Sequence, residues 1–302
     1  MERITPMKKI IGIDIGGTTI KADVYDDMGN SLRDYREVDS HINYENQSNT
    51  ILEQVCQLIG EFQASHDIDG VGISSAGVVD SQKGNIVYAG YTIPGYIGTN
   101  FTETVKKRFH LPIAVENDVN CAALGEAWLG NAKGLSNVVM ITVGTGIGGS
   151  VILDGHIVTG HHFTAGEVGY LPIKGQDWQN LASTTALVKL YEEKSGKKKQ
   201  TGRSFFTNIE KRDPIANDTL DIFIDYLTDG ILTISYLLNP DALIIGGGIF
   251  TEPALLLSKI RNSLDSKVQD SIFLPKYIVA ASLGNAAGRI GAVKHFINQH
   301  LL

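Results

Sequence analysis

Residues 10–27, IIGIDIGGTTIKADVYDD, decide how the rest of the chain is interpreted. Isoleucines surround one acidic residue, Asp14, and run into the pair Gly16 and Gly17, after which apolar and polar residues alternate. This pattern predicts a strand, a glycine turn and a second strand. Backbone N–H groups of such a turn can approach an anion without interference from Cβ atoms. Further donors at its rim are hydroxyl and amine groups, on Thr18, Thr19 and Lys21. The stretch therefore predicts a phosphate-binding hairpin.

A second stretch, residues 138–155, repeats this layout as VVMITVGTGIGGSVILDG. Its turn contains Gly144, Thr145 and Gly146 between two apolar runs. A third cluster, Gly246, Gly247 and Gly248, follows the apolar run ALII. Repetition predicts a duplicated fold whose halves face each other across a cleft, with three glycine turns available to a nucleotide. Three unrelated tight turns are the alternative in a chain with 33 glycines.

Length and charge narrow the class of protein. A chain of 302 residues predicts two domains of ordinary size. A formal net charge of −7 provides no basic footprint, so neither nucleic acid nor an anionic membrane is an expected partner. The basic run at 197–199 is interpreted as a solvated loop, with phosphate contact as the minor alternative.

The two cysteines and the N-terminus indicate a cytoplasmic protein. Cys56 and Cys121 stand apart without a CxxC pattern, which predicts neither disulfides nor a zinc ribbon. No signal core and no run of about 18 apolar residues are evident. Residues 1–6 are expected to be a frayed extension before the first strand.

The middle of the chain delivers polar side chains to the end of a strand. A helix at 49–62, capped by Ser48 or Asn49, and a buried strand at 68–74 precede a long loop at 87–101. That loop contains Tyr88, Tyr91 and Tyr96. A helix at 101–109 and a strand at 111–115 then lead to ENDVN at 116–120. Ligands of α/β sheets bind at such strand ends. A helix N-cap is the other reading of this run, and both can hold.

The second half predicts more helices and strands around one further polar motif. GHHFTAGEVGY at 160–170 contains Glu167 and two adjacent histidines. His161 and His162 would point opposite ways in an extended backbone, which disfavours a metal site. The expected elements are helices at 181–194, 219–238, 255–264 and 286–300 and strands at 242–245 and 276–280.

Taken together, these stretches resemble the ROK family of sugar kinases and sugar-sensing repressors, within the actin-like ATPase superfamily. The resemblance rests on DIGGTTIK at 14–21, ENDVN at 116–120, VGTGIGG at 143–149, AGEVG at 165–169 and GGGI at 246–249. It implies an α/β fold with two actin-like (ribonuclease H-like) domains around an ATP cleft, each a mixed sheet flanked by helices. The small N-terminal domain would comprise residues 1–117, with 287–302 returning to it, and the larger C-terminal domain 118–286.

The resemblance also implies roles for individual residues. Asp118 matches the family's catalytic base, which accepts the proton of a sugar hydroxyl in phosphoryl transfer. Asn117 and Glu167 match ligands of sugar hydroxyls, and Gly77, in the turn after the strand at 68–74, is a further substrate-binding candidate. Asp14 would lie near Mg²⁺ through water. The β- and γ-phosphates would be held by the two hairpins, through Gly16, Gly17, Thr18, Lys21, Gly144, Thr145 and Gly146. Gly246 and Gly247 would border the adenosine. The products would be a sugar 6-phosphate and ADP.

Two departures from the family pattern concern the sugar. Many family members have a histidine that binds sugar and orients a zinc ion where this chain has Tyr170, and residues 174–183 contain no cysteine, so no zinc is expected. Gln179 replaces a glutamate that binds the anomeric hydroxyl. This pattern resembles the zinc-free branch with β-glucoside kinases, which act on O6 of the non-reducing glucose of cellobiose. The tyrosine-rich loop could stack on the second ring.

The sequence alone leaves two alternative functions open. The first is a kinase for a monosaccharide such as glucose, fructose or N-acetylmannosamine. The second is a non-catalytic sugar-sensing regulator. It is disfavoured because only nine residues precede Ile10, too few for a DNA-binding domain, and because Asp118 is present. The expected partners are ATP, a small sugar or glycoside and, by family habit, a second copy of the chain in a homodimer.

Overall fold

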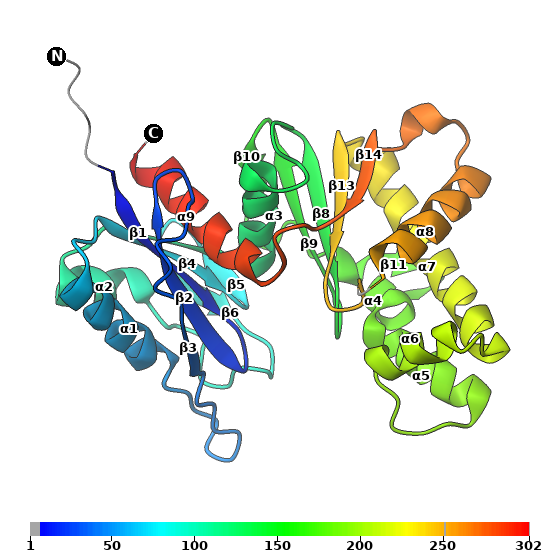
Figure 1. Cartoon of the computed structure of the whole chain (residues 1–302), viewed down its shortest axis with the longest axis horizontal. Helices are drawn as coiled ribbons and strands as arrows, with labels where there is room; N and C mark the ends of the chain where they lie inside the picture. Colours follow the sequence, from blue (N-terminus) through cyan, green and yellow to red (C-terminus); the bar gives the residue numbers. More distant parts are fainter. Residues whose placement is uncertain (1–6, 251, 302) are drawn as a thin grey trace. The chain divides into compact units, whose positions relative to one another are not determined.

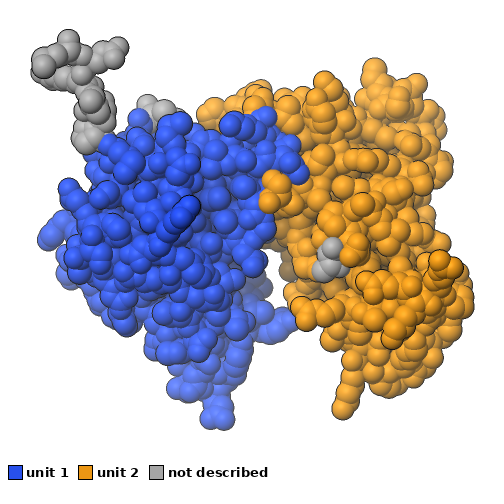
Figure 2. All heavy atoms as spheres, in the orientation of Figure 1, with its two compact units in different colours: residues 1–133, 159–165, 283–302 blue, residues 134–158, 166–282 orange. Residues whose placement is uncertain are grey.

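The computed structural model describes residues 7–250 and 252–301 (Figure 1). The predicted extension at residues 1–6 lies outside the described residues. The chain forms two compact units, which Figure 2 distinguishes by colour. Unit 1 comprises residues 1–133, 159–165 and 283–302, and unit 2 comprises 134–158 and 166–282. Each unit has its own hydrophobic core on an α/β framework, as the sequence predicted.

Unit 1 is built on a mixed sheet with the strand order β3-β2-β1-β4-β7. These strands are β1 (Lys9–Ile15), β2 (Thr19–Asp26), β3 (Arg36–Asp39), β4 (Gly70–Ser75) and β7 (Ile113–Asn117). The first hairpin is confirmed, since β1 and β2 are antiparallel and pair Asp14 with Lys21. β4 then joins β1 in parallel and β7 joins β4 in parallel. Parallel pairing brings the carboxyl ends of β1, β4 and β7 to one edge of the sheet.

Helices cover both faces of this sheet (Figure 1). They are α1 (Ile51–Ser65), α2 (Phe101–Phe109), α3 (Asp118–Leu129) and α9 (Ala287–His300). Alternate β1 residues such as Ile11 and Ile13 belong to the core under α1. The opposite face meets α9 at glycines, where a Cβ on Gly72 would lie 2.2 Å from the Ala292 carbonyl oxygen. Such close approach leaves no room for larger residues at these positions.

The border of unit 1 lies beyond the predicted domain border at residue 117. Helix α3 packs against α9 so closely that a Cβ on Gly291 would stand 1.6 Å from the Cys121 carbonyl oxygen. Unit 1 therefore keeps α3 and extends to Lys133. At α1, Thr50 occupies the N-cap position without a side-chain cap bond, and the predicted cap Asn49 accepts the Ile51 N–H at 3.2 Å instead.

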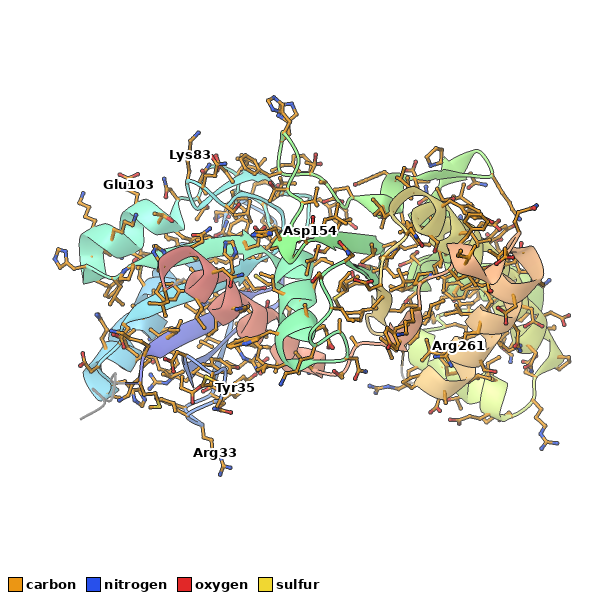
Figure 3. The ribbon with its side chains drawn as sticks, turned by 90° about the horizontal axis from the view of Figure 1, so that it is seen from above. Arg33, Tyr35, Lys83, Glu103, Asp154 and Arg261 are labelled. Atoms are coloured by element: carbon orange, nitrogen blue, oxygen red, sulfur yellow. The ribbon has the colours of Figure 1, made fainter. Side chains whose placement is uncertain are left out.

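Unit 2 repeats the central arrangement with the strand order β10-β9-β8-β13-β14. The strands are β8 (Val138–Val143), β9 (Ile147–Leu153), β10 (His156–Ile157), β13 (Ala242–Gly246) and β14 (Tyr277–Ala280). β8 and β9 form an antiparallel hairpin and β13 joins β8 in parallel, as β1, β2 and β4 do in unit 1. The predicted duplication is therefore visible in the topology. Arg261 of α8 (Pro253–Lys267) donates to the Ile278 carbonyl oxygen at 2.8 Å and ties this helix to β14 (Figure 3).

The helices of unit 2 are α4 (Trp178–Ala182), α5 (Thr184–Ser195), α6 (Gly202–Glu210), α7 (Pro214–Leu238) and α8. They differ from the predicted ones chiefly in a divided helix and a missed one, and α7 and α8 are longer than predicted. One predicted helix at 181–194 is two helices, because Ser183 ends α4 and caps α5 through a bond from the Ala186 N–H. Helix α6 was missed. Its signal was a capping box, in which Thr201 and Ser204 bond each other's backbone, ahead of the buried pair Phe205 and Phe206.

The remaining elements are short. They are β5 (Val78–Asp80), β6 (Asn85–Tyr88), β11 (Pro172–Ile173), β12 (Gln176–Asp177), η1 (Val168–Tyr170), η2 (Ser271–Phe273) and η3 (Gly284–Ala286). Antiparallel pairing of β5 with β6 places a hairpin before the predicted loop at 87–101. Across the described ranges we find no helix with both the length and the apolar composition needed to cross a membrane.

Candidate active site

Asp118 is the first residue of α3, directly after β7. The N-cap of this helix is Asn117, whose Oδ1 accepts the N–H groups of Val119 at 2.9 Å and Asn120 at 3.1 Å. The amide nitrogen of Asn117 donates to the Gly77 carbonyl oxygen and to Asp118 Oδ1, both at 2.9 Å. The cap interpretation of this run is therefore right, and the same amide orients the carboxylate of Asp118. A sugar hydroxyl bound by Asn117 would have to replace one of these bonds.

The electrostatic surroundings of Asp118 suit a proton acceptor. Removal from water raises the pKa of its carboxyl to about 6, and the negative charge of Asp14 acts in the same direction. Hydrogen bonds from the Val119 N–H and the Asn117 amide oppose the rise because they stabilise the ionised form. A carboxylate with a pKa close to neutrality is a stronger base than an ordinary aspartate and is still ionised at pH 7.

This pKa predicts the pH dependence of turnover. A base must be deprotonated to act, so kcat/KM for the sugar should rise with pH through about 6 and reach a plateau above it. One unit below the pKa, the rate should be about tenfold lower than the plateau because about a tenth of the carboxyl is ionised. Initial rates under subsaturating sugar, measured across the acidic to neutral range, check this. A profile that is flat down to pH 5 would contradict the assignment of Asp118 as base.

A second buried carboxyl, which the sequence analysis did not assign, supports the turn that holds Asp118. Glu116 Oε1 accepts the N–H of Asn117 at 2.7 Å and the side-chain amide of Asn120 at 3.0 Å. Burial raises the pKa of Glu116. A charged residue at the end of an otherwise apolar strand was the signal in the sequence. Through these bonds Glu116 fixes the backbone on which the cap and the base stand.

The first glycine turn lies at the end of β1, next to Asp14. Ser74 Oγ, on the neighbouring strand β4, donates to Asp14 Oδ1 at 2.6 Å. Burial raises the pKa of Asp14, while Ser74, Arg289 and Lys21 counteract the rise. The Gly16 N–H closes the turn on the Thr19 carbonyl oxygen at 3.0 Å. A half-buried carboxylate next to a glycine turn fits a position near Mg²⁺ and phosphate.

Unit 2 has a hollow of about 590 Å³ at its own glycine turn. It is lined by Gly144, Thr145, Thr184, Thr185, Val188, Lys189, Glu192, Gln200, Gly202, Arg203 and Gly248. The start of α5 holds this turn, since the Thr184 N–H donates to the Gly144 carbonyl oxygen and Thr185 Oγ1 to that of Thr145, both at 2.8 Å. The volume lies in the usual range of small-molecule sites.

The third glycine cluster borders the same hollow through Gly248. Gly247 has a φ of +102°, and a Cβ there would lie 2.3 Å from the Val143 carbonyl oxygen, so only glycine fits. The structure thus brings two of the three glycine turns together within unit 2. It also adds Lys189 on α5 and Arg203 on α6, to which the sequence analysis gave no site role.

The remaining predicted sugar ligands of unit 2 lie close to its glycine turn. Tyr170, in η1, is exposed, and its N–H donates to the Glu167 carbonyl oxygen at 3.3 Å. Removal from water raises the pKa of Glu167. The side chain of Gln179 on α4 lies beside the turn, since a Cβ on Gly146 would come within 2.7 Å of Gln179 Oε1. Gln179 thus lies next to the glycines predicted to hold phosphate.

The comparison with known proteins settles the family. The chain matches the ROK family along residues 10–299. The chain belongs to the ROK family. It is 31% identical to the β-glucoside kinase of Listeria innocua over 96% of this chain and 98% of that protein. The identification predicted from the sequence motifs is thereby confirmed.

Two solved structures are similar to this ROK protein over nearly its whole length. One is a ROK family glucokinase from Streptomyces griseus in complex with glucose and AMPPNP, with a TM-score of 0.77, 28% identity and coverage of 96% of this chain and 98% of that one. The other is a ROK family protein from Streptococcus pneumoniae in complex with sucrose, with a TM-score of 0.84, 28% identity and coverage of 97% and 99%. The ROK chain is accordingly an ATP-dependent sugar kinase, as the sequence predicted.

The histidine pair does not adopt the extended backbone assumed for it. His161 and His162 lie in a turn, and their ring centroids are 4.4 Å apart. Among the residues that the structure describes, no three His, Cys, Asp or Glu side chains come together as a metal site. The expectation that this ROK kinase binds no zinc stays a prediction.

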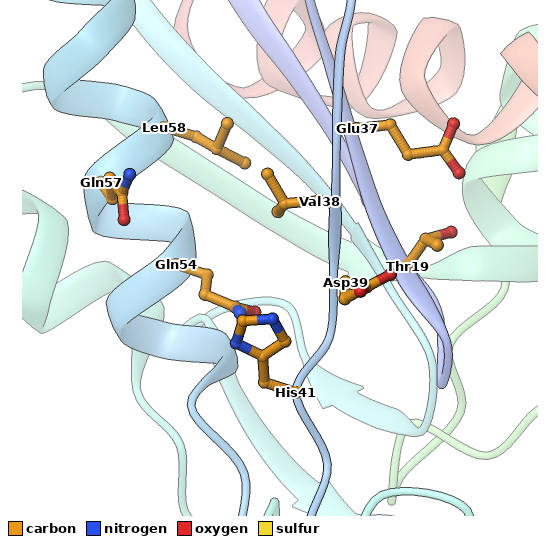
Figure 4. Close-up of a pocket in the computed structure, with 8 residues that line it drawn as sticks. All are labelled: Thr19, Glu37, Val38, Asp39, His41, Gln54, Gln57 and Leu58. Atoms are coloured by element: carbon orange, nitrogen blue, oxygen red, sulfur yellow. The ribbon is translucent and has the colours of Figure 1, made fainter.

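One further hollow in unit 1 lies apart from these residues. About 570 Å³ in volume, it lies between edge strand β3 and helix α1 and is lined by Thr19, Glu37, Val38, Asp39, His41, Gln54, Gln57 and Leu58 (Figure 4). The side chain of Glu37 points away from α1 in this view. Of the residues predicted to bind phosphate, Thr19 alone lines this hollow, and neither Asp14 nor Asp118 does, so the hollow lies outside the candidate active site.

Proposed function

We propose that this ROK kinase transfers the γ-phosphoryl group of ATP to the 6-hydroxyl of a glucose unit, with a β-glucoside such as cellobiose as the favoured acceptor. A single observation carries the transfer step: Asp118 stands at the start of α3 with a pKa of about 6 and an orientation set by Asn117. The alternative acceptor is a monosaccharide such as glucose, fructose or N-acetylmannosamine.

The proposed step moves one proton and one phosphoryl group. The sugar oxygen forms a bond to the γ-phosphorus while the bond from that phosphorus to the bridging oxygen of ADP breaks. The hydroxyl proton passes to Asp118, because an alcohol is too weak a nucleophile without a base. The partial positive charge at the N-terminus of α3 stabilises the carboxylate before transfer.

The nucleotide would occupy the hollow of unit 2. Gly144 and Thr145 would contact phosphates, and Gly246 and Gly247 would border the adenosine, as the sequence predicted. Arg203 could neutralise phosphate charge or stack on the base. The first glycine turn would contribute Gly16, Gly17, Thr18 and Lys21. Mg²⁺ supplies neutralisation of the developing phosphate charge when bound, and Asp14 is the carboxylate placed to hold it through water.

The preference for a glycoside rests on the residues at the predicted anomeric end of the sugar. Gln179 has an amide and Tyr170 has a phenol, so neither side chain is a carboxylate. Without a carboxylate at this end, the sugar does not need a free anomeric hydroxyl to donate a hydrogen bond. The 31% identity to a β-glucoside kinase and the similarity to a structure containing sucrose support an acceptor with two rings. The similarity to a glucokinase supports the alternative.

An ATP-consumption screen tests the proposal. Free hexoses, N-acetylated hexosamines, methyl β-glucoside and cellobiose should be compared at equal concentration, with product position assigned by NMR of the phosphorylated sugar. We expect the β-glucosides to show the highest kcat/KM. Faster turnover of free glucose than of any glucoside would replace the favoured acceptor by the alternative. Absence of turnover with every sugar would overturn the kinase function.

Restoring a carboxylate at Gln179 should shift this preference. In Gln179→Glu, a free anomeric hydroxyl gains an acceptor, so the ratio of kcat/KM for glucose over methyl β-glucoside should rise roughly tenfold. The same change at the exposed neighbour Gln176 is the control and should leave the ratio unaltered. Equal ratios in wild type and Gln179→Glu would remove Gln179 from the acceptor site.

A homodimeric state and a cytoplasmic location stay predictions.

A further inference from the structure

One exposed tyrosine ends β6 and another follows it, in a loop that belongs to the same unit as Asp118. The three tyrosines of the predicted loop differ sharply in burial. Tyr96 is 0% exposed and belongs to the core, Tyr88 is exposed at the end of β6, and Tyr91 is 91% exposed. Of the three tyrosines that were expected to stack on a sugar, only Tyr88 and Tyr91 are therefore exposed enough to do so. Single exposed apolar side chains are normal on a protein surface, but among the described residues Tyr91 is the most exposed large apolar side chain.

A chain of contacts connects this loop to the acceptor carboxylate. The side-chain amide of Asn117 donates to Asp118 Oδ1 and to the Gly77 carbonyl oxygen, both at 2.9 Å. Gly77 in turn lies against the loop, since a Cβ there would stand 2.7 Å from the Tyr88 carbonyl oxygen. Its φ of +91° and this contact both require glycine. The loop that carries Tyr91 therefore begins three contacts away from Asp118, through Asn117 and Gly77.

The same loop is held in place at several points beyond Tyr91. The hydroxyl of Tyr96 and Ser75 Oγ, at the end of β4, are hydrogen-bonded at 2.7 Å. The Asn49 side-chain amide donates to the Pro94 carbonyl oxygen at 2.9 Å. Ile93, two residues after Tyr91, is buried in the core under α1. A ring on such an anchored segment loses little conformational freedom when a ligand binds.

A second exposed tyrosine is bonded to the same loop. Tyr44, from the loop between β3 and α1, is 58% exposed, and its hydroxyl donates to the Thr92 carbonyl oxygen at 3.2 Å. Thr92 directly follows Tyr91. Tyr44 is thus tied to the residue next to Tyr91, although the two tyrosines are 47 positions apart in the sequence. No local pattern around Tyr44 indicated this role.

We propose that Tyr91, flanked by Tyr44, is a stacking platform for the second ring of a glycoside acceptor. This inference rests on the proposed function, because it needs a first glucose ring placed at Asp118. A pyranose ring has an apolar C–H face that packs on an aromatic ring, and its hydroxyls remain in water. The occupant is therefore a second sugar ring or a flat aglycone attached to the phosphorylated unit. A monosaccharide would not reach the platform.

Truncating the ring tests the proposal. In Tyr91→Ala, the ratio of kcat/KM for cellobiose over methyl β-glucoside should fall about tenfold, mainly through KM, because only the two-ring acceptor loses contact area. Tyr91→Phe retains the ring and should keep the wild-type ratio within about twofold. Tyr44→Ala should lower the same ratio in the same direction. The matched control is Tyr277→Ala, an exposed tyrosine on strand β14 of unit 2, which should leave it unaltered.

The outcomes separate this inference from the function on which it rests. Equal losses for cellobiose and methyl β-glucoside in Tyr91→Ala would overturn the platform, because they would indicate damage to the loop. A wild-type ratio in Tyr91→Ala would overturn it as well. Turnover of glucose without turnover of any two-ring acceptor would overturn the platform and leave the sugar kinase intact. Absence of turnover with every sugar would overturn both.

Discussion

Replacing Asp118 by asparagine should abolish phosphoryl transfer while leaving nucleotide binding nearly intact. The amide keeps the shape of the side chain and an oxygen for the Val119 N–H, but it cannot accept the hydroxyl proton. General base catalysis is worth a factor of 10² to 10⁴, so we expect kcat to fall about a thousandfold. Coupled ATP-consumption assays give the rate, and titration with a fluorescent ATP analogue gives the affinity.

A matched control separates the base from general effects of lost charge. Asp154→Asn removes the same charge from an exposed turn of unit 2 (Figure 3). Its backbone is left-handed, which asparagine tolerates well, so both rate and stability should be close to wild type. Ordinary turnover in Asp118→Asn would remove Asp118 from its proposed role. A parallel loss of nucleotide affinity would indicate that the substitution had disturbed more than the proton acceptor.

Replacing Gly291 by alanine should produce the largest loss of stability among the substitutions considered. A Cβ at this position would stand 1.6 Å from the carbonyl oxygen of Cys121 and 2.3 Å from its carbonyl carbon, and both atoms belong to the backbone of α3. Backbone cannot rotate away as a side chain can, so α3 and α9 must separate. Overpacking of this kind costs about 2–3 kcal/mol, even after the better helix propensity of alanine is counted.

Urea unfolding followed by circular dichroism measures this loss as a lower midpoint. The control is Gly60→Ala in α1, where the new Cβ would meet only the Phe109 ring at an ordinary 3.6 Å. At that position alanine should leave the free energy of unfolding unaltered or raise it by about 0.5–1 kcal/mol. Destabilisation of the same size in both variants would mean that packing between α3 and α9 is not the cause.

Local sequence patterns were sufficient to predict many of the strands and hairpins of the fold. Apolar runs ending in glycines predicted both hairpins, and the strand before ENDVN predicted a polar strand end, because turn chemistry and side-chain alternation are properties of neighbouring residues. The same logic failed at α6. A lysine-rich run suggested a loop, whereas the segment that follows it forms a helix because Phe205 and Phe206 are buried in the core of unit 2.

In the candidate site, too, the sequence predicted some features, whereas others depend on tertiary packing. Asp118 and Asn117 were predicted together, but their sequence could not show that the amide of Asn117 is engaged by the cap, Gly77 and Asp118 at once. Lys189 and Arg203 line the hollow of unit 2 only because α5 and α6 present one face of each to the glycine turn. Such convergence depends on how helices pack, which no short motif encodes.

By itself the amino-acid sequence determined the ROK family and the repeated glycine hairpins, and it predicted Asp118 as the acceptor carboxylate. These follow from the order of residues within short segments, where glycine freedom, alternation and residue chemistry act locally. Only the tertiary structure decided that Tyr96 is a core anchor, that Tyr91 is exposed, and that Tyr44 is bonded to the next residue, Thr92. Burial and contact between distant residues are set by sheet register and loop anchoring, and these are properties of the folded chain as a whole.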